Sequence, residues 1–343
     1  MSVFSRIRGF FSRHRNKFIV GGIIITGSIL LTKYAQQRLR EWQEKETIEF
    51  LERNRKQNHF ESISRTCDQT ISNLSGALYE VIFKAINTDE IIEMLKTNPE
   101  NKLSLWNDLK ILVFAKSGVI IYSTVMLVVT LRIQMSIIGG YLYKDPNSIS
   151  TEMQEKYLSV CQTFLDLGVS KLSKVMEIEV KKIMDGVNLK KQLKLSDLEA
   201  IYWSLQTAVA TNNENPIDKF KSYILHENLN NSNEMFNNIL RDTADFLDSD
   251  EVKSLTTHCI NRGFILLGDQ IAEFYTQNGT ITLPHTEVDR FQNPFEIKKP
   301  LAKLLPIING LLSKQSFPQL LIQQLIASEK LQILSANIYE SLL

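Results

Sequence analysis

Few side chains in this sequence have the type and spacing that chemistry requires. His258 and Cys259 could each bind a metal ion, but neighbours on a helix point about 100° apart, whereas metal ligands must converge. The sequence contains no phosphate-binding glycine loop, no dinucleotide-binding glycine pattern and no nucleophile elbow, and its five histidines are scattered. We therefore predict that the chain is not an enzyme, and we expect no metal and no cofactor.

Two other motifs are better explained by structure than by catalysis. The double glycine in "IIGGY", at 137–141, is typical of a helix C-cap or of a close crossing between two helices. Asp242 and Asp245 are spaced as neighbours on a polar helix face, which predicts a solvated surface.

The segment "MLKTNPENKLSLWNDLK", residues 94–110, is the best candidate for a binding surface. Trp106 and Leu109 share one helix face, and a bend at Pro99 would fold the preceding short helix, with Leu95, back alongside them. The lysines that would border this hollow are Lys96, Lys102 and Lys110. An apolar groove with an aromatic anchor and a basic rim suits an amphipathic helix with acidic flanks. On the residues alone, the simpler interpretation is favoured, that Trp106 and Leu109 begin the core stripe of the next helix.

Composition and charge limit the class of protein. The chain has 343 residues, 43% of them hydrophobic, with only 14 Gly and 8 Pro, which is typical of a folded chain. Residues 1–40 contain eight Lys or Arg and no acid, so the remainder holds 31 basic residues against 38 acidic ones, a net charge of −7. The acidic remainder argues against binding to nucleic acid. Three widely spaced cysteines favour a reducing compartment.

The run "NKFIVGGIIITGSILLTKY", residues 16–34, predicts a membrane anchor. Residues 18–32 carry no charge, and the lysines on both sides can extend this short span by snorkelling. No small-residue cleavage site follows, which disfavours a secretory signal peptide. We also considered a transit peptide and a buried element of the main fold. We predict a basic targeting segment at 1–17, with Arg6, Arg8, Arg13, Arg15 and Lys17, and a transmembrane anchor at 18–32.

The remaining chain shows helical periodicity almost throughout. Residues 33–57 predict a charged linker helix, and 58–343 predict a cytosolic helical domain. Within that domain we expect helices over 59–86, 88–98, 153–184, 195–210, 234–247, 251–276, 297–312 and, with breaks, 318–342. Thr88 or Asp89 is the expected N-cap of the second of these helices. The predicted fold class is all-α, a single large bundle of long helices behind an N-terminal membrane anchor.

A second apolar run, residues 117–141, could be a membrane span or a buried helix. Lys116 and Arg132 bracket its 15 uncharged residues. Polar residues recur inside the run, and an amphipathic stretch leads straight into it. We therefore favour a buried central helix. A multi-span channel or transporter, which would need this run to cross the bilayer, remains the alternative, as does a membrane-tethered helical enzyme.

Five blocks of the sequence, in order, resemble the peroxin-3 family (peroxisomal biogenesis factor 3). They are "HFESISRTCD" (59–68), "NKLSLWNDLK" (101–110), "YSTVMLVVTLRIQMSIIGGYLYKD" (122–145), "CINRGFILLGDQIAEF" (259–274) and "PLAKLLPIINGLL" (300–312). The resemblance is weakest around 190–235.

This resemblance implies a single-pass protein of the peroxisomal membrane with its helical domain in the cytosol. Its expected function is that of a docking receptor for peroxin-19, the soluble chaperone that carries newly made peroxisomal membrane proteins. The family receives an amphipathic N-terminal helix of peroxin-19 in a groove whose residues match Trp106, Leu109, Leu95, Lys96 and Lys102. Membrane lipid and other peroxins are further expected partners. The balance of basic charge around the anchor slightly favours a cytosolic N-terminus, whereas the resemblance places it in the peroxisomal lumen.

Overall fold

The computed structural model describes residues 3–97, 99–225, 233–276, 296–314 and 316–343, with side chains from residue 33 onward except Ala35. It divides into two units, Met1–His59 and Phe60–Leu343. Helix α1 (Val3–Ala85) begins in the first unit and ends in the second. The predicted linker at 33–57 is helical, and nearly all its described side chains are exposed. The predicted targeting segment and anchor, 1–17 and 18–32, lie outside the described side chains and stay predictions.

The second unit is built from helices, which confirms the all-α class. The helices after α1 are α2 (Thr88–Lys96), α3 (Lys102–Lys144), α4 (Thr151–Leu158), α5 (Val160–Thr163), the π-helical turn η1 (Phe164–Gly168), α6 (Val169–Met184), α7 (Leu195–Ala210), α8 (Phe220–Ile224), α9 (Glu234–Asp248), α10 (Asp250–Thr276), α11 (Leu301–Ser313), α12 (Ser316–Ile326) and α13 (Glu329–Ser341). Two short strands, β1 (Gln192–Leu193) and β2 (Lys299–Pro300), pair antiparallel.

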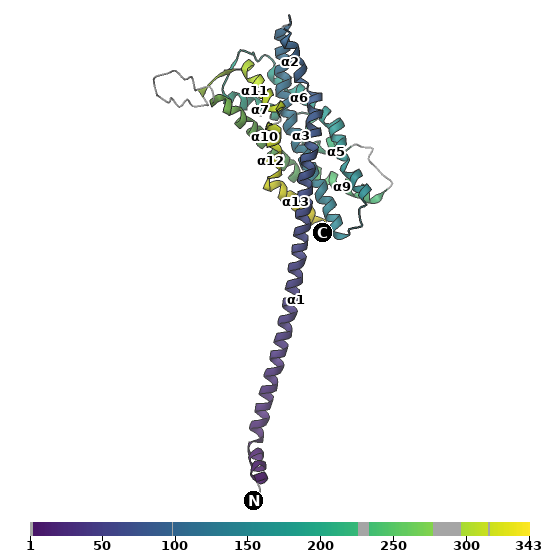
Figure 1. Cartoon of the computed structure of the whole chain (residues 1–343), viewed down its shortest axis with the longest axis vertical. Helices are drawn as coiled ribbons and strands as arrows, with labels where there is room; N and C mark the ends of the chain where they lie inside the picture. Colours follow the sequence, from purple (N-terminus) through teal and green to yellow (C-terminus); the bar gives the residue numbers. More distant parts are fainter. Residues whose placement is uncertain (1–2, 98, 226–232, 277–295, 315) are drawn as a thin grey trace, which may run out of the picture. The chain divides into compact units, whose positions relative to one another are not determined.

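Helix α3 forms the centre of this unit, as Figure 1 shows. Helices α2, α6, α10, α11, α12 and α13 all pack against it. Every residue from Val113 to Gly140 is buried. In the described part of the chain, α3 is the one helix long and apolar enough to cross a membrane, but 89% of its most apolar window is buried inside the protein. The prediction of a buried central helix is therefore confirmed.

The two charges that bracket the apolar run are buried in α3 and have partners there. Arg132, 1% exposed, donates hydrogen bonds to the Asp68 carboxylate (2.6 Å), to Ser64 Oγ (3.1 Å) and to the Ile326 carbonyl (3.3 Å). Lys116, 2% exposed, donates to Thr88 Oγ1 (3.0 Å) and Ser313 Oγ (3.1 Å). These bonds offset the desolvation of the two charges. They also connect α3 to α1, α2, α11 and the end of α12.

The double glycine lies at a close helix crossing, one of its two predicted explanations. Helix α3 continues beyond it to Lys144, so the pair is not a C-cap. A Cβ on Gly140 would lie 2.8 Å from Leu342 Cβ and 3.3 Å from the Tyr339 carbonyl. Only glycine allows the C-terminal end of the chain to approach α3 this closely.

Four local expectations were wrong. The helix predicted over 297–312 begins only at Leu301, because residues 299–300 pair with β1 as strand β2. The helix predicted over 153–184 is interrupted at Ser159 and contains the π-helical turn η1. The N-cap of α2 is Asn87, whose side chain accepts a hydrogen bond from the Glu90 N–H (3.2 Å), and not Thr88 or Asp89. Asp242 is not simply solvated, because its carboxylate accepts a hydrogen bond from Tyr141 Oη (2.8 Å), whereas Asp245 is exposed.

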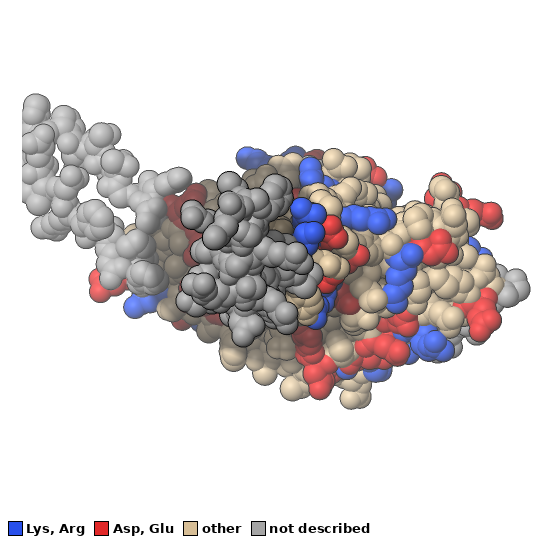
Figure 2. All heavy atoms as spheres, turned by 90° about the horizontal axis from the view of Figure 1, so that it is seen from below, with Lys and Arg blue, Asp and Glu red and all other residues tan. Residues whose placement is uncertain are grey.

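The surface carries both signs of charge. Figure 2 shows basic and acidic side chains interspersed on the described part of the end that it views. The net negative charge of the body is thus distributed on this face and does not form a single acidic patch.

Candidate functional site

The candidate site lies where α2 meets the first turns of α3. Helix α2 is short and is stabilised at its N-terminus in two ways. The Asn87 side chain accepts a hydrogen bond from a free N–H group of the first turn, and the negative charges of Asp89 and Glu90 interact favourably with the helix dipole. It packs against α3, as the predicted bend at Pro99 requires. Leu95, near its end, is half-buried against the core, and Lys96 is exposed and pairs with Glu93 (2.6 Å).

The first turns of α3 mark the change from an exposed to a buried helix. Lys102 is exposed, and Leu103 is 71% exposed. Trp106 is half-buried and packs against the core, while Leu109 is 3% exposed and belongs to the core itself. Of the five predicted residues, Leu95 and Trp106 are therefore each half-buried against the core, and Lys96 and Lys102 are exposed. Leu109 is buried in the core and is not itself accessible to a partner.

Lys110 is not on the rim of the hollow, and that expectation was wrong. It is 5% exposed and donates hydrogen bonds to the carbonyls of Met184 (3.1 Å) and Val187 (2.8 Å), at and just beyond the end of α6. Burial lowers its pKa, and nearby Asp185 opposes this shift. A cation at the C-terminus of a helix satisfies carbonyls that have no helical partner. Lys110 therefore fastens α3 to α6.

Sequence reasoning missed two exposed apolar side chains at this site. Met94 on α2 is 42% exposed, and Leu103 on α3 is 71% exposed. Leu103 also lines a pocket of about 440 Å³ between α3 and residues 184–189. The spacing of Leu103 three residues before Trp106 was a signal for the same helix face. It was missed because amphipathic counting assigns every regularly spaced leucine to the core.

The described residues include no cluster of metal ligands, and their three cysteines are buried. No group of three or more His, Cys, Asp or Glu among the described residues could hold a metal ion. Burial raises the pKa of the Cys67 and Cys161 thiols to about 12 and that of Cys259 to about 11. With such raised pKa values the thiols stay protonated at neutral pH, and a protonated thiol is a poor nucleophile. That the chain is not an enzyme stays a prediction.

The fold and site define an all-α protein with a buried apolar central helix and a partly apolar surface at its start. The chain belongs to the peroxin-3 family: the family model Peroxin-3 matches residues 9–101, 96–145 and 141–341. It is 33% identical to "Peroxisomal biogenesis factor 3" of Rattus norvegicus, over 97% of this chain and 96% of that protein. It is 32% identical to the Homo sapiens protein of the same name, with the same coverage.

A more distant relative is "Peroxisome biogenesis protein 3-1" of Arabidopsis thaliana, 27% identical over 56% of this chain and 61% of that protein. The family model together with these relatives supports a role in peroxisome biogenesis. The same comparisons associate the chain with the peroxisomal membrane.

Proposed function

We propose that this protein is the docking receptor for peroxin-19 at the peroxisomal membrane, and that it receives the amphipathic N-terminal helix of that chaperone at the start of α3. Docking would concentrate cargo-loaded peroxin-19 at the membrane, where membrane proteins are inserted. In this role the protein localises peroxin-19 at the membrane and needs to perform no covalent chemistry.

The observation that carries the proposal is the apolar surface where α2 meets α3. Met94 near the end of α2 and Leu103 in the first turn of α3 are exposed, and Trp106 in the second turn of α3 is half-buried. Exposed apolar side chains around an aromatic anchor are typical of a helix-binding surface.

The basic side chains of the site fit the acidic flanks expected of the partner helix. Lys96 and Lys102 are exposed on α2 and α3 respectively. Rim charges of this kind accelerate association and select the partner more than they add affinity. In this proposal Trp106 and Leu95 contact the apolar face of the peroxin-19 helix, and Leu109 acts by holding Trp106 in place.

We further propose that the anchor at 18–32 holds the protein as a single-pass membrane protein, with the unit 60–343 in the cytosol. The burial of α3 supports one span, because a helix packed on all sides by protein is not available to lipid. The basic residues before the anchor, Arg6 to Lys17, are the proposed targeting segment.

The test is a titration of the full chain, reconstituted in phosphatidylcholine nanodiscs, with a labelled peptide of the N-terminal helix of peroxin-19. We expect saturable binding that Trp106→Ala weakens by about 2–4 kcal/mol, which is roughly thirty- to several-hundred-fold in Kd. Trp203→Ala, at a tryptophan 67% exposed on α7, is the matched control and should bind normally.

Melting of each variant separates binding from folding. Unchanged affinity in a Trp106→Ala variant that melts normally would refute the site. A lowered melting temperature with normal affinity would show that Trp106 serves only the core.

A further inference from the structure

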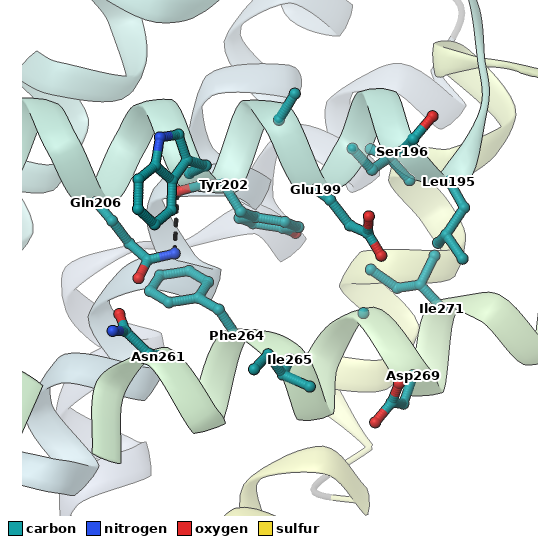
Figure 3. A pocket seen from close by; sticks show the side chains of 14 residues that line it. Leu195, Ser196, Glu199, Tyr202, Gln206, Asn261, Phe264, Ile265, Asp269 and Ile271 are labelled. Carbon is teal, nitrogen blue, oxygen red and sulfur yellow. Dashed lines mark hydrogen bonds between the residues drawn. The ribbon is translucent and has the colours of Figure 1, made fainter. Parts of the chain in front are cut away.

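A second apolar groove lies between α7 and α10, and no residue of α2 or α3 lines it. It has a volume of about 620 Å³. Figure 3 shows the side chains of both helices that line it, with Gln206, Asn261 and Phe264 toward one end and Leu195, Ser196 and Ile271 toward the other. The groove is therefore a seam between two packed helices, open along its length.

The floor of the groove is buried and held in position. Tyr202 and Phe264, 3% and 5% exposed, pack ring to ring with centroids 5.5 Å apart. The Tyr202 hydroxyl lies 3.3 Å from Ser117 Oγ on α3, so the ring is bonded to the central helix. Because its floor belongs to the core, the groove needs no rearrangement to receive a ligand.

Each wall presents a large apolar side chain to solvent. Trp203 on α7 is 67% exposed, and Ile265 on α10 is 54% exposed. Both line the groove, immediately beside the buried residues Tyr202 and Phe264. An exposed tryptophan next to a rigid apolar floor is typical of a protein-binding surface, since tryptophan is enriched among residues that dominate binding energy.

The charged side chains of the groove are both acidic. Glu199 stands on α7 and Asp269 on α10, and no Lys or Arg lines the groove. Neither carboxylate forms an ion pair with another residue that the structure describes. This is the reverse of the α2–α3 surface, where Lys96 and Lys102 are exposed. The two surfaces therefore suit partners of opposite charge.

Gly268 lines the groove on α10 and has no side chain to fill it. A Cβ added to it would meet no atom within 4 Å. A glycine at this position lets the backbone of another helix approach α10 closely. The lining residues extend over about three helical turns on each side, Leu195 to Gln206 and Asn261 to Ile271, so a ligand helix of about the same length would fill the seam.

We propose that the α7–α10 groove docks an amphipathic helix of a partner protein whose apolar face is bordered by Lys or Arg. The apolar face covers Trp203, Ile265 and the Tyr202–Phe264 floor, and the basic side chains reach Glu199 and Asp269. This inference goes beyond the docking of peroxin-19, because it uses other helices and the opposite charge.

The experiment uses the full chain in phosphatidylcholine nanodiscs and two synthetic helical peptides of eleven to fifteen residues. One carries leucines at helical spacing with lysines on the other positions, and the second has every lysine replaced by glutamate. Empty nanodiscs give the contribution of lipid alone. We expect the lysine peptide to bind at least tenfold more tightly than the glutamate peptide.

Three variants and one control locate the binding. Trp203→Ala should weaken binding of the lysine peptide at least tenfold, whereas Trp42→Ala, at a tryptophan 62% exposed in residues 33–59, should leave it unchanged. Gly268→Leu should block the groove without lowering the melting temperature, because a Cβ there meets no atom within 4 Å. The double variant Glu199→Lys, Asp269→Lys should reverse the preference between the two peptides.

Equal binding of both peptides, or binding that Trp203→Ala and Gly268→Leu leave intact, would overturn the proposal. So would a dimer of this chain that Trp203→Ala dissociates, since the groove would then be covered by a second copy. Trp106→Ala should not affect the lysine peptide, and Trp203→Ala should not affect the peroxin-19 peptide. Each docking site can therefore fail without the other.

Discussion

Helix α3 and residues 33–59 of α1 are both long uninterrupted helical stretches, yet they use charge in opposite ways. Residues 33–56 contain twelve charged side chains in twenty-four positions, nearly all exposed. Helix α3 has few charges, and Lys110, Lys116 and Arg132 among them are buried. That a segment is helical therefore says little about its structural role. The contacts of its charged side chains are more informative.

The partners of the charges show the difference. In residues 33–59 an ion pair between Arg38 and Glu41 (3.8 Å) joins positions three apart on the same helix, and both side chains are more than half exposed. Such a pair supports its own helix by a few tenths of a kcal/mol. In α3, Arg132 and Lys116 bind groups more than 25 positions away in the sequence. Buried charges thus fix the tertiary arrangement around α3.

The largest expected effect comes from breaking the Arg132 cluster. Arg132→Ala removes three hydrogen bonds and leaves Asp68 without its cation, in a position where burial already raises the pKa of that carboxyl. We expect a loss of about 3 kcal/mol in the free energy of unfolding, the lower end for a broken buried pair, because the Asp68 side chain is 32% exposed and can hydrate. Urea denaturation followed by circular dichroism measures it.

Arg38→Ala is the matched control for that variant. Its side chain is 70% exposed, so the unfolding free energy should change by less than about 0.5 kcal/mol. If the two arginine variants lost equal stability, the contrast between α3 and residues 33–59 would be wrong.

A pair of glycines on α10 sharpens the contrast between buried and open positions within a single helix. A Cβ on Gly263 would lie 2.7 Å from Ile121 Cγ2 of α3, whereas a Cβ on Gly268 would meet nothing within 4 Å. We expect Gly263→Ala to destabilise the protein by about 1–3 kcal/mol through overpacking. Gly268→Ala should stabilise it by about 0.5–1 kcal/mol through helix propensity. Equal and same-sign shifts in the two urea midpoints would contradict this.

The sequence predicted the helices well because their periodicity is local. The bounds expected for 195–210 match α7, and those for 234–247 and 251–276 differ from α9 and α10 by one residue at one end. The interruption at Ser159 and the pairing of β1 with β2 were not predictable in this way. The strand pair joins Leu193 to Lys299, more than a hundred residues apart, and two residues are too few for an alternating pattern.

The sequence predicted which helix face carries the candidate site but not how deeply each of its residues is buried. Spacing identifies which face of a helix carries Trp106 and Leu109, but it cannot say where along the helix that face becomes covered. That depends on where α2 and α6 end against α3, which is a tertiary property. Hence Leu109 lies in the core, Lys110 binds the end of α6, and Leu103, which periodicity treats as ordinary, is the exposed residue.

One further effect is absent at neutral pH and is expected only in the alkaline range, where stability should depend on pH. Burial raises the pKa of the Cys259 thiol from 9.0 to about 11. Between those values the unfolded chain loses the thiol proton and the folded chain keeps it, so the unfolded state binds fewer protons and stability falls as pH rises. The contribution of this thiol should be fully present below pH 9.0 and fall by about 1.4 kcal/mol per pH unit toward pH 11.

Comparison of the unmodified protein with Cys259→Ala isolates this contribution. Other buried groups also titrate in the alkaline range: the raised pKa of Cys67 acts in the same direction, and the lowered pKa of Lys116 acts in the opposite direction. Both are common to the two proteins and cancel in the difference. The variant should be less stable at pH 7, because it loses a core contact, yet lose stability less steeply from pH 9 to 10.5. Parallel curves of unfolding free energy against pH would show that the thiol ionises as readily in the folded protein as in the unfolded chain. Its burial beside α3 would then be incomplete.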